Sequence, residues 1–297
     1  MAVGCVQPSA SGPVDDRLHI GPYGVTVTNQ AVKAEQFLRL HHGETPLLLA
    51  NPWDAGTAKL FFALGFRALA TTSSGHAATL GRLDGGVTRD EALGHAAAIV
   101  AATDLPVSAD LENCFADDPA GVADTVRLAM DTGLAGCSVE DYTGSDDHPI
   151  YELAHAADRV AAAAEAAHSK PVRLILTARS ENYLHNRPDL SDTVARLQAF
   201  QAAGADVLYA PGVIEAADIR RIVESVDLPV NVLALPGVPS VAELAELGVA
   251  RVSVGGGLNL VGLGAVVKAA RELLQAGTYS YWDQAQEGIA VRSTAFE

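Results

Sequence analysis

Residues 106–112 read Pro-Val-Ser-Ala-Asp-Leu-Glu, an apolar run that follows a proline and ends in two carboxylates two positions apart. Residues i and i+2 of a β-strand project from one face, so Asp110 and Glu112 are expected to point the same way. A second run, residues 136–141, also ends in acids, Glu140 and Asp141. Such acids can cap the next helix. Two acidic strand ends side by side instead form an oxygen-lined pocket, which suits a hard cation such as Mg²⁺ and favours a functional site.

The run at 106–112 belongs to a repeat of eight apolar runs. Four runs start at a proline and four start at a glycine, in alternation: Pro46, Gly65, Pro106, Gly133, Pro171, Gly204, Pro229 and Gly248. Proline at the first residue of a strand loses no ladder hydrogen bond, and glycine after a helix adopts the left-handed cap. Segments with helical spacing, such as 120–130 and 192–203, follow the runs. This alternation predicts a parallel sheet covered by helices.

Eight strand–helix units predict a (β/α)₈ barrel, an α/β fold with its active site at the carboxyl ends of the strands. We expect a flexible arm at 1–25, then a single barrel domain with a C-terminal helical extension at 26–297. A short helix is expected near 31–40. The alternative is an open doubly wound sheet, which favours a G-x-G-x-x-G first turn. Residues 51–56 read Asn-Pro-Trp-Asp-Ala-Gly and lack that motif.

The composition narrows the class of partner. A net charge of −16 and a pI near 4.8 argue against nucleic acid and anionic membranes as partners. A small anionic substrate fits, because a bound cation and local arginines can invert the field inside a pocket. Three cysteines are too few for a disulfide framework, and no apolar run reaches the ~18–20 residues of a membrane span. We therefore expect a cytoplasmic protein.

The other strand ends add polar groups. The Ser-Ser-Gly turn at 73–75 can hold a carboxylate or phosphate, although such turns are often plain loops. Arg179 ends the fifth run and can pair with the acids or grip a substrate carboxylate. Asn231 is a polar residue at an expected buried position of the seventh run. None of the four lysines follows a strand, which argues against a Schiff-base aldolase.

Three further side chains have a functional and a structural interpretation. His76 and His148 lie on loops at the site end, where they could titrate near neutrality or be merely solvated. Cys114 could be a nucleophile, but no strand end supplies an evident paired base.

Residues 37–278 resemble the isocitrate lyase and phosphoenolpyruvate mutase superfamily. The resemblance rests on six motifs taken in order: Asn-Pro-Trp-Asp-Ala at 51–55, Ser-Ser-Gly at 73–75, Leu-Asp-Gly at 83–85, Asp-Leu-Glu at 110–112, Val-Glu-Asp at 139–141 and Thr-Ala-Arg at 177–179. It implies a Mg²⁺ (or Mn²⁺) enzyme that makes or breaks a C–C or P–C bond of a small 2-oxo or 2-hydroxy carboxylate, through a metal-bound enolate. It also implies a homo-oligomer, tetramer or dimer, whose subunits exchange a C-terminal helix, so that residues beyond 258 would lie at an interface.

The resemblance also assigns roles. It makes Asp110 a metal ligand, with Glu112 and Glu140 holding the metal directly or through water, and Asp84 in the same polar cluster. Ser74 and Gly75 would hold the substrate carboxylate, and Arg179 would clamp the substrate. The full set of candidate substrate-binding residues is Trp53, Asp54, Ser73, Ser74, Gly75, Arg179 and Asn231.

The chain departs from the family where the reaction is selected. Residues 142–149 read Tyr-Thr-Gly-Ser-Asp-Asp-His-Pro, with neither the Lys-Lys/Arg-Cys-Gly-His loop of the C–C lyases nor the lysine and asparagine of the mutases. Glu112 replaces the second aspartate of Asp-x-Asp, and Pro211 stands where C–C lyases have a glutamate. Our hypothesis is a Mg²⁺-dependent C–C lyase in which Tyr142 or His148 carries the proton beside Arg179. The alternatives are a P–C mutase or hydrolase and a barrel that binds a carboxylate without turning it over.

Overall fold

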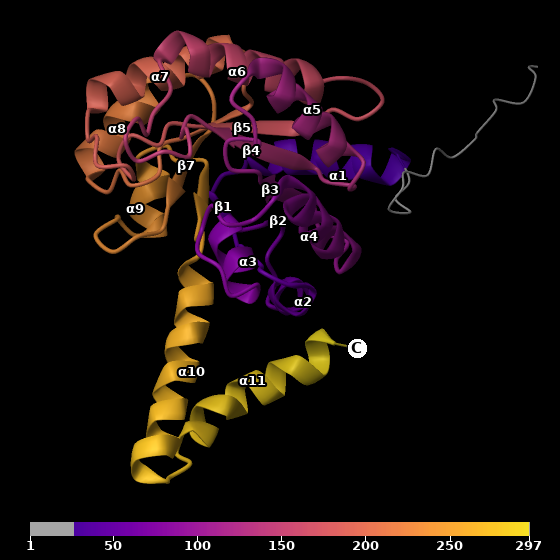
Figure 1. Ribbon diagram of the computed structural model, residues 1–297, viewed down its shortest axis with the longest axis vertical. Coiled ribbons are helices and arrows are strands. Elements are labelled where there is room, and N and C mark those ends of the chain that lie inside the picture. The colour runs from indigo at the N-terminus through magenta and orange to yellow at the C-terminus, as the bar shows by residue number, and fades with distance from the viewer. Residues whose placement is uncertain (1–26, 297) are drawn as a thin grey trace, which may run out of the picture.

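Eight parallel strands form a barrel surrounded by helices in the computed structural model, which describes residues 27–296 (Figure 1). The strands are β1 (Leu47–Leu49), β2 (Leu69–Ala70), β3 (Val107–Asp110), β4 (Gly136–Glu140), β5 (Ile175–Arg179), β6 (Val207–Tyr209), β7 (Val230–Leu233) and β8 (Arg251–Ser253). They pair in the order β1-β8-β7-β6-β5-β4-β3-β2. A parallel bridge between Ala50 and Leu69 joins the two outer strands and closes the ring. The predicted (β/α)₈ barrel is confirmed, and the open sheet is excluded.

The helices follow the strands as the repeat predicts. They are α1 (Val27–Leu40), α2 (Ala55–Ala63), α3 (Ser73–Thr79), α4 (Arg89–Ala101), α5 (Pro119–Met130), α6 (Leu153–Ala167), α7 (Leu190–Ala202), α8 (Ala216–Ser225), α9 (Val241–Glu246), α10 (Gly257–Ala276) and α11 (Tyr281–Ala295). Side chains of Asp54, Thr88 and Ser240 close capping boxes that start α2, α4 and α9. No helix within residues 27–296 combines the length and the apolar character that crossing a membrane would require.

The four strands expected after a glycine start three or four residues beyond it, and three of the four expected after a proline start at the next residue, but β5 starts late. Pro171 is followed by three residues outside any strand, and β5 begins only at Ile175. The amide of Leu174 donates to the carbonyl of Ala167 (2.8 Å), so this segment closes the turn from α6 before it can pair with β4. The predicted arm at 1–25 lies outside the described residues.

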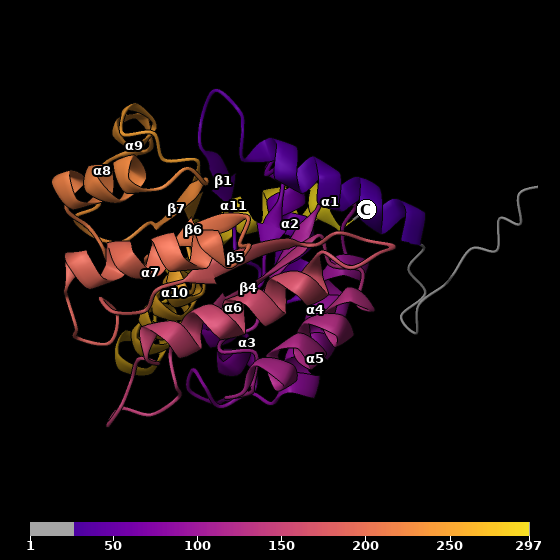
Figure 2. The same cartoon turned by 90° about the horizontal axis from the view of Figure 1, so that it is seen from above.

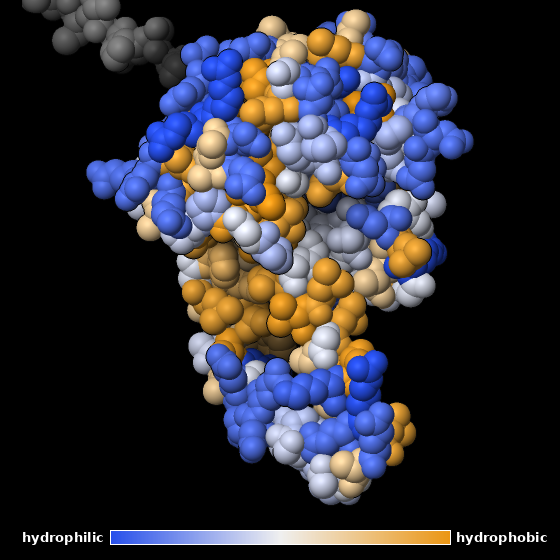
Figure 3. Space-filling model, turned by 90° about the vertical axis from the view of Figure 1, so that its left-hand side faces the viewer, coloured by the Kyte–Doolittle hydropathy of each residue, from blue (hydrophilic) through white to orange (hydrophobic). Residues whose placement is uncertain are grey.

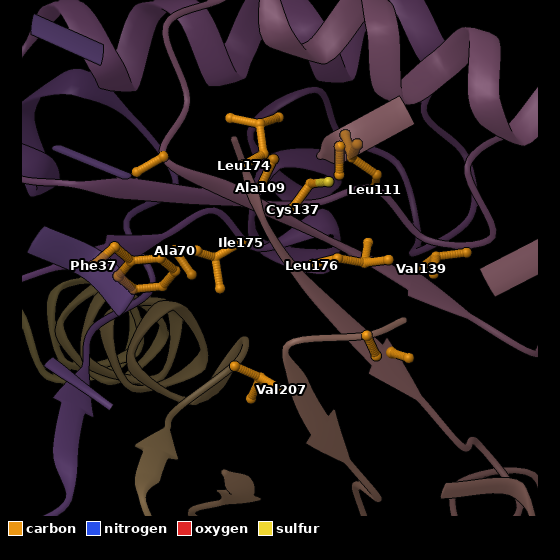
Figure 4. Packing of buried hydrophobic residues seen from close by; sticks show 14 of the residues in the cluster. Phe37, Ala70, Ala109, Leu111, Cys137, Val139, Leu174, Ile175, Leu176 and Val207 are labelled. Carbon is orange, nitrogen blue, oxygen red and sulfur yellow. The ribbon is translucent and has the colours of Figure 1, made fainter. Parts of the chain in front are cut away.

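The apolar core lies mainly in the layer between the strands and the helices (Figure 4). Phe37 of α1 is fully buried and lies beside Ile175, where it covers the amino end of the barrel. A Cβ at Gly136, the first residue of β4, would lie 3.0 Å from the Phe37 ring and 2.6 Å from the Ile175 carbonyl oxygen. Glycine is therefore required for this close approach, and α1 is a fixed part of the barrel.

The last two helices leave the barrel. Figures 1 and 2 show α10 projecting away from it and α11 turning back toward α2. Gly277 makes this turn possible, because it ends α10 in the left-handed conformation (φ 64°), which glycine adopts without strain. A C-terminal helical extension is thus present, and most of its side chains are exposed.

Candidate active site

A cavity of about 170 Å³ opens at the carboxyl ends of the strands. Loops after β1, β2, β5 and β8 line it together with the strand ends, and the lining side chains include Asn51, Ser73, Asp110 and Arg179. Ligand sites for drug-sized molecules measure ~300–1,000 Å³, so this cavity suits a small substrate. A larger hollow of about 440 Å³ lies on the amino-terminal side of the barrel, beside residues 43–48 and 64–67, but it brings no cluster of acids together.

Asn51 holds three strand ends in place. Its Oδ1 accepts from the amides of Val254 (3.1 Å) and Gly255 (3.0 Å), and its Nδ2 donates to the carbonyl oxygen of Thr71 (3.0 Å). The side chain is buried, so these bonds are shielded from competing water. The loops after β1, β2 and β8 thereby form one rigid edge of the cavity.

Asp110 is the most firmly positioned acid of the site. Its amide donates to Thr71 Oγ1 (2.9 Å), and its Oδ2 accepts from the Ser73 hydroxyl (3.0 Å) and the Ser73 amide (3.3 Å). Its Oδ1 accepts from the Glu112 amide (3.3 Å) and from Arg179 (2.9 Å). The carboxylate therefore has one orientation, at the end of β3 and facing the cavity.

Arg179 is the hub of the charged cluster. Its Nη1 lies 2.9 Å from Asp110 Oδ1, its Nη2 lies 3.1 Å from Glu140 Oε2, and its Nε lies 2.8 Å from Glu181 Oε1. The guanidinium also lies over the ring of Tyr209, 5.3 Å from its centroid. Only 13% of the Arg179 side chain is exposed, so a strong, fixed positive charge stands at the mouth of the barrel.

The remaining acids are crowded and desolvated. Burial raises the pKa of Glu112 to about 7, and repulsion from Asp110 and Asp84 adds to the rise. Burial, then repulsion from Asp110, likewise raises the pKa of Asp84. The pKa of Glu140 is raised well above its ordinary value by burial, against the opposing effect of Arg179. Carboxylates that repel one another in this way would be relieved by a bound cation.

The donor set fits a hard, largely hydrated cation. The acids offer oxygen only, which is what Mg²⁺ and Mn²⁺ prefer. Within residues 27–296, however, no group of three His, Cys, Asp or Glu side chains converges closely enough to enclose an ion. Mg²⁺ commonly uses one or two carboxylates and keeps several waters, so the site is compatible with it but not with an all-protein cage.

Close packing shapes the turn after β2. Ser73 and Ser74 line the cavity, and the Thr72 hydroxyl caps α3 by accepting from the Gly75 amide (3.3 Å). A Cβ at Gly75 would lie 2.6 Å from the Thr72 methyl and 3.1 Å from Trp53, and one at Gly256 would lie 2.6 Å from Ser74 Oγ. Glycine at both positions lets the start of α10 lie against this turn. Asp84 and Asn231 also line the cavity.

Asp110 and Glu112 do not lie on one face of a strand, so that prediction is wrong. β3 ends at Asp110, and Glu112 has a left-handed backbone (φ 50°), so strand alternation does not govern its direction. Cys114 and Phe115 are left-handed too, with φ of 59° and 55°. The chain turns sharply out of the barrel here. Glu112 lies with Asp110 in a small adjoining hollow lined also by His76 and His95.

The structure does not bring Trp53 or Asp54 to the cavity. The Asp54 carboxylate caps α2 by accepting from the Thr57 amide (2.7 Å) and the Thr57 hydroxyl (2.9 Å). Trp53 packs edge-on against Phe61, and its carbonyl oxygen lies 3.0 Å from His95 Nε2. Both residues therefore shape the loop after β1 rather than the cavity wall.

The two candidate proton carriers are placed differently. The Tyr142 ring stacks on His185, with centroids 3.8 Å apart, and His185 lies 4.0 Å from Glu181 of the charged cluster. Burial, then Asp146 and Glu140, raise the pKa of Tyr142. His148 is exposed, and the hydrogen bond at this residue uses its backbone carbonyl, which accepts from the Thr143 hydroxyl (2.7 Å). Tyr142 thus lies beside the charged cluster, whereas the His148 ring lies on the solvent side of the loop.

The other two candidates have structural surroundings. Burial raises the pKa of Cys114 well above its ordinary value, which keeps it a neutral thiol and argues against a nucleophile. His76 stacks on His95, with centroids 3.9 Å apart and planes 8° apart. Burial lowers the pKa of His76, so it is neutral near pH 7.

Several residues of the site were not predicted as such. Glu181 pairs with Arg179 two positions away, a spacing visible in the sequence. Arg159 is fully buried in α6 and donates to the carbonyl oxygens of Glu140 (2.9 Å), Asn113 (2.5 Å) and Ala116 (2.9 Å). It ties the strained loop after β3 to the end of β4. An arginine in an alanine-rich helix was the available signal, but its partners are far away in the chain.

The chain is similar in sequence and in structure to proteins of one family. The sequence model for phosphoenolpyruvate phosphomutase matches residues 37–274. A Burkholderia cenocepacia J2315 crystal structure, provisionally assigned as a lyase or mutase, is 49% identical with a TM-score of 0.87, covering 90% of this chain and 96% of that one. A second structure from that organism, provisionally assigned as a phosphonomutase, is 36% identical with a TM-score of 0.76 and coverages of 84% and 100%. 2-Methylisocitrate lyase of Escherichia coli K12 is 28% identical over 63% of this chain and 64% of the enzyme.

Proposed function

Because the chain belongs to the phosphoenolpyruvate mutase family, within the isocitrate lyase and phosphoenolpyruvate mutase superfamily of enzymes, we propose that it is a Mg²⁺-dependent lyase. Its substrate is a small 2-oxo or 2-hydroxy carboxylate, and the bond made or broken is C–C. The observation that carries this proposal is the meeting of Asp110 and Glu140 with Arg179 at the mouth of a small cavity.

In this proposal the acids at the carboxyl ends of the strands hold the Mg²⁺ ion. Asp110 is the direct ligand, and Glu112, Glu140 and Asp84 hold it directly or through water. Burial is the main cause of the raised pKa values of Glu112 and Asp84, and repulsion from neighbouring acids adds to it; a bound cation would relieve this repulsion, which supports the assignment. When bound, Mg²⁺ supplies a Lewis acid that stabilises negative charge on a substrate oxygen. Mn²⁺ would serve in the same way.

The remaining residues bind and orient the substrate. Ser73 and Ser74 line the cavity beside Asp110, where they hold the substrate carboxylate. Gly75 does not line the cavity and its amide donates to Thr72, so its part is to keep this turn in place. Arg179 keeps its guanidinium fixed between three acids and so offers a preorganised positive charge, which costs no reorganisation when charge develops on the substrate. Asn231 contributes an amide from β7.

The loop at 142–149 handles the proton and excludes water. Its two ends are joined, since the Thr143 amide donates to the Pro149 carbonyl oxygen (2.8 Å), and Tyr142 anchors it on His185. Closure over the cavity would bring His148 inward from solvent and shield the reacting atoms from stray protonation. Tyr142 and His148 are therefore the proposed proton carriers.

The two buried free thiols, Cys114 and Cys137, agree with a reducing cytoplasmic location.

We also propose that the protein is a homo-oligomer, dimer or tetramer, in which α10 and α11 pack on a second copy. Figure 3 shows a broad apolar surface where these helices meet the barrel. Leu260, Val261, Val266 and Leu274 are each exposed by 66% or more, which is unusual for a free surface. The 440 Å³ hollow beside Leu48 adds a second uncovered apolar region.

The oligomer is tested by light scattering after size-exclusion chromatography. Val261→Glu and Leu274→Glu should shift the assembly toward monomer, while Leu128→Glu, on the outer face of α5, should leave it unchanged. A wild-type protein that stays monomeric at all concentrations would refute the interface.

The reaction is tested by incubating the protein with Mg²⁺ and a panel of 2-hydroxy and 2-oxo acids, and measuring release of a 2-oxo acid. Asp110→Ala is the matched blank. A second candidate, P–C bond cleavage or transfer, is favoured by the similarity to the phosphonomutase-assigned structure, so the panel includes phosphonates. Binding without any product would instead indicate a carboxylate-binding barrel.

A further inference from the structure

A second arginine lies deep in the same cavity and has no place in the function proposed above. Arg251 begins β8, at the amino end of the barrel, and only 4% of it is exposed. Its Nε donates to Asn231 Oδ1 (2.9 Å), and its Nη1 donates to Thr177 Oγ1 (3.2 Å) and lies 3.2 Å from His41 Nε2. These bonds leave Nη2 with no hydrogen-bond partner among the described residues. Arg251 also lines the 170 Å³ cavity.

Its charge is not matched by an acid. Within residues 27–296, no Asp or Glu forms an ion pair with Arg251. Burial lowers the pKa of Arg251 to about 10, with a further contribution from Arg179, so the side chain remains charged near neutrality. His41 cannot compensate, because burial and Arg251 itself lower its pKa to about 3 and leave it neutral. A buried, unpaired cation is costly unless something else offsets its charge.

The interior around Arg251 is polar and lined by small side chains. Branched apolar residues usually fill the layers of a (β/α)₈ barrel. Here the cavity descends between Ser108, Ser138, Thr177 and Ser253, which come from four different strands. Asn231 joins two levels of this wall, since its Nδ2 donates to Ser253 Oγ (2.9 Å) while its Oδ1 accepts from Arg251. Hydrogen-bond donors thus line an open space at the bottom of the site.

Arg159 is a second buried arginine, and its surroundings differ from those of Arg251. It is as deeply buried as Arg251 and lacks an acidic partner within the described residues. Three carbonyl oxygens and the ring of Tyr151 surround its guanidinium, however, and although its Nε has no partner in the described part of the chain, Arg159 does not line the 170 Å³ cavity. A structural arginine in this protein is therefore enclosed by acceptors, whereas Arg251 faces open space.

The charges are separated along the barrel axis. Acids surround Arg179 at the mouth, where a cation is expected, and an unmatched cation lies at the floor. We propose that Arg251, with Asn231 and Ser253, binds a second anionic group of the substrate, a carboxylate or phosphonate, and so selects substrates with two anionic ends. The assignment of the substrate group that binds at the mouth of the cavity rests on the function proposed above. The anion site at the floor does not depend on it.

The test compares two probes that differ only at the far end. Malate and 2-hydroxybutanoate share a 2-hydroxy carboxylate, and malate adds a second carboxylate. Isothermal titration in the presence of Mg²⁺ should show that the wild type binds malate at least ~10-fold more tightly, the effect expected of a hydrogen bond to a charged group. Phosphonoacetate and propionate form the corresponding pair for a phosphonate end.

Variants assign the preference to Arg251. Arg251→Met should remove the preference for malate and change 2-hydroxybutanoate binding less than ~3-fold, and Arg251→Lys should retain part of it. Lys33→Met removes another buried positive charge, one that does not line the cavity, and should leave the preference intact. Circular dichroism confirms folding. If Arg251→Met does not fold, Ser253→Ala should still reduce the preference for malate.

Two results would overturn the inference. One is a wild type with equal affinity for both probes, or with no malate binding below a Kd of about 10 mM. The other is an Arg251→Met protein that folds and keeps the full preference. The proposed reaction fails separately: a protein that selects malate through Arg251 but never releases a product refutes the lyase and leaves the anion site standing.

Discussion

Replacing Arg179 by Met should destabilise the protein strongly, and more so at high pH. Methionine fills a similar volume without charge, and it leaves Glu140 and Glu181, which are 8% and 2% exposed, without their cation. Breaking a buried ion pair costs about 3–5 kcal/mol. The acids can limit this loss by taking up a proton. For one carboxyl with an ordinary pKa near 4.5, that costs about 4 kcal/mol at pH 7.5 and about 1.4 kcal/mol at pH 5.5.

The sign of the pH effect follows from proton uptake. One of these two acids stays ionised against Arg179 in the wild type, so only in Arg179→Met does the folded state bind this extra proton above pH ~4.5. The stability of the variant therefore falls by about 1.4 kcal/mol per pH unit relative to the wild type. The expected loss is therefore about 2.7 kcal/mol larger at pH 7.5 than at pH 5.5.

Urea unfolding followed by circular dichroism at both pH values measures this difference. Arg179→Lys keeps the positive charge and should follow the pH dependence of the wild type. A loss below ~1 kcal/mol that does not vary with pH would refute the reasoning, because the acids would then not depend on Arg179 for their charge.

Three further predictions concern single residues. Asp110→Ala should abolish both activity and the Mg²⁺-dependent rise in Tm while the barrel still folds; a rise equal to that of the wild type would remove Asp110 as a ligand. His148→Ala should lower kcat by roughly 10²-fold with little change in Mg²⁺ binding, measured by steady-state kinetics and titration, and an unchanged kcat would make His148 a solvated loop residue. In Asp206, burial raises the pKa, but hydrogen bonds from His168, the Leu176 amide and Arg173 outweigh it and lower the pKa. Asp206→Asn should therefore cost about 1–3 kcal/mol at pH 7, and urea unfolding should show this difference vanishing as the pH falls through the folded pKa, below ~3.9.

The sequence alone determined the architecture, because the signals for a (β/α)₈ barrel are local. Proline and glycine mark where strands can begin, and helical spacing marks what lies between them. Each such preference involves residues a few positions apart, so eight repetitions sufficed to predict the barrel. The late start of β5 was missed because it depends on the turn that the Leu174 amide makes with Ala167.

The sequence also predicted that Asp110, Glu140 and Arg179 meet, because the barrel rule places all strand ends at one mouth, and the structure brings them together there. It could not state their partners. Asp110 and Arg179 are 69 positions apart, and only barrel closure decides that they lie 2.9 Å from each other. Trp53 and Asp54 were predicted to bind the substrate because of their motif. The loop after β1 instead directs both side chains toward α2.

Tertiary structure alone decided which charges are compensated. Arg159 and Arg251 look like any other arginine in the sequence, one in a helix and one at the start of a strand. Burial and the groups around them determine that one is enclosed by carbonyl oxygens and the other faces an open cavity. The free energy of a charge depends on its solvation and on neighbours that come from distant segments, and neither is encoded in short-range sequence patterns.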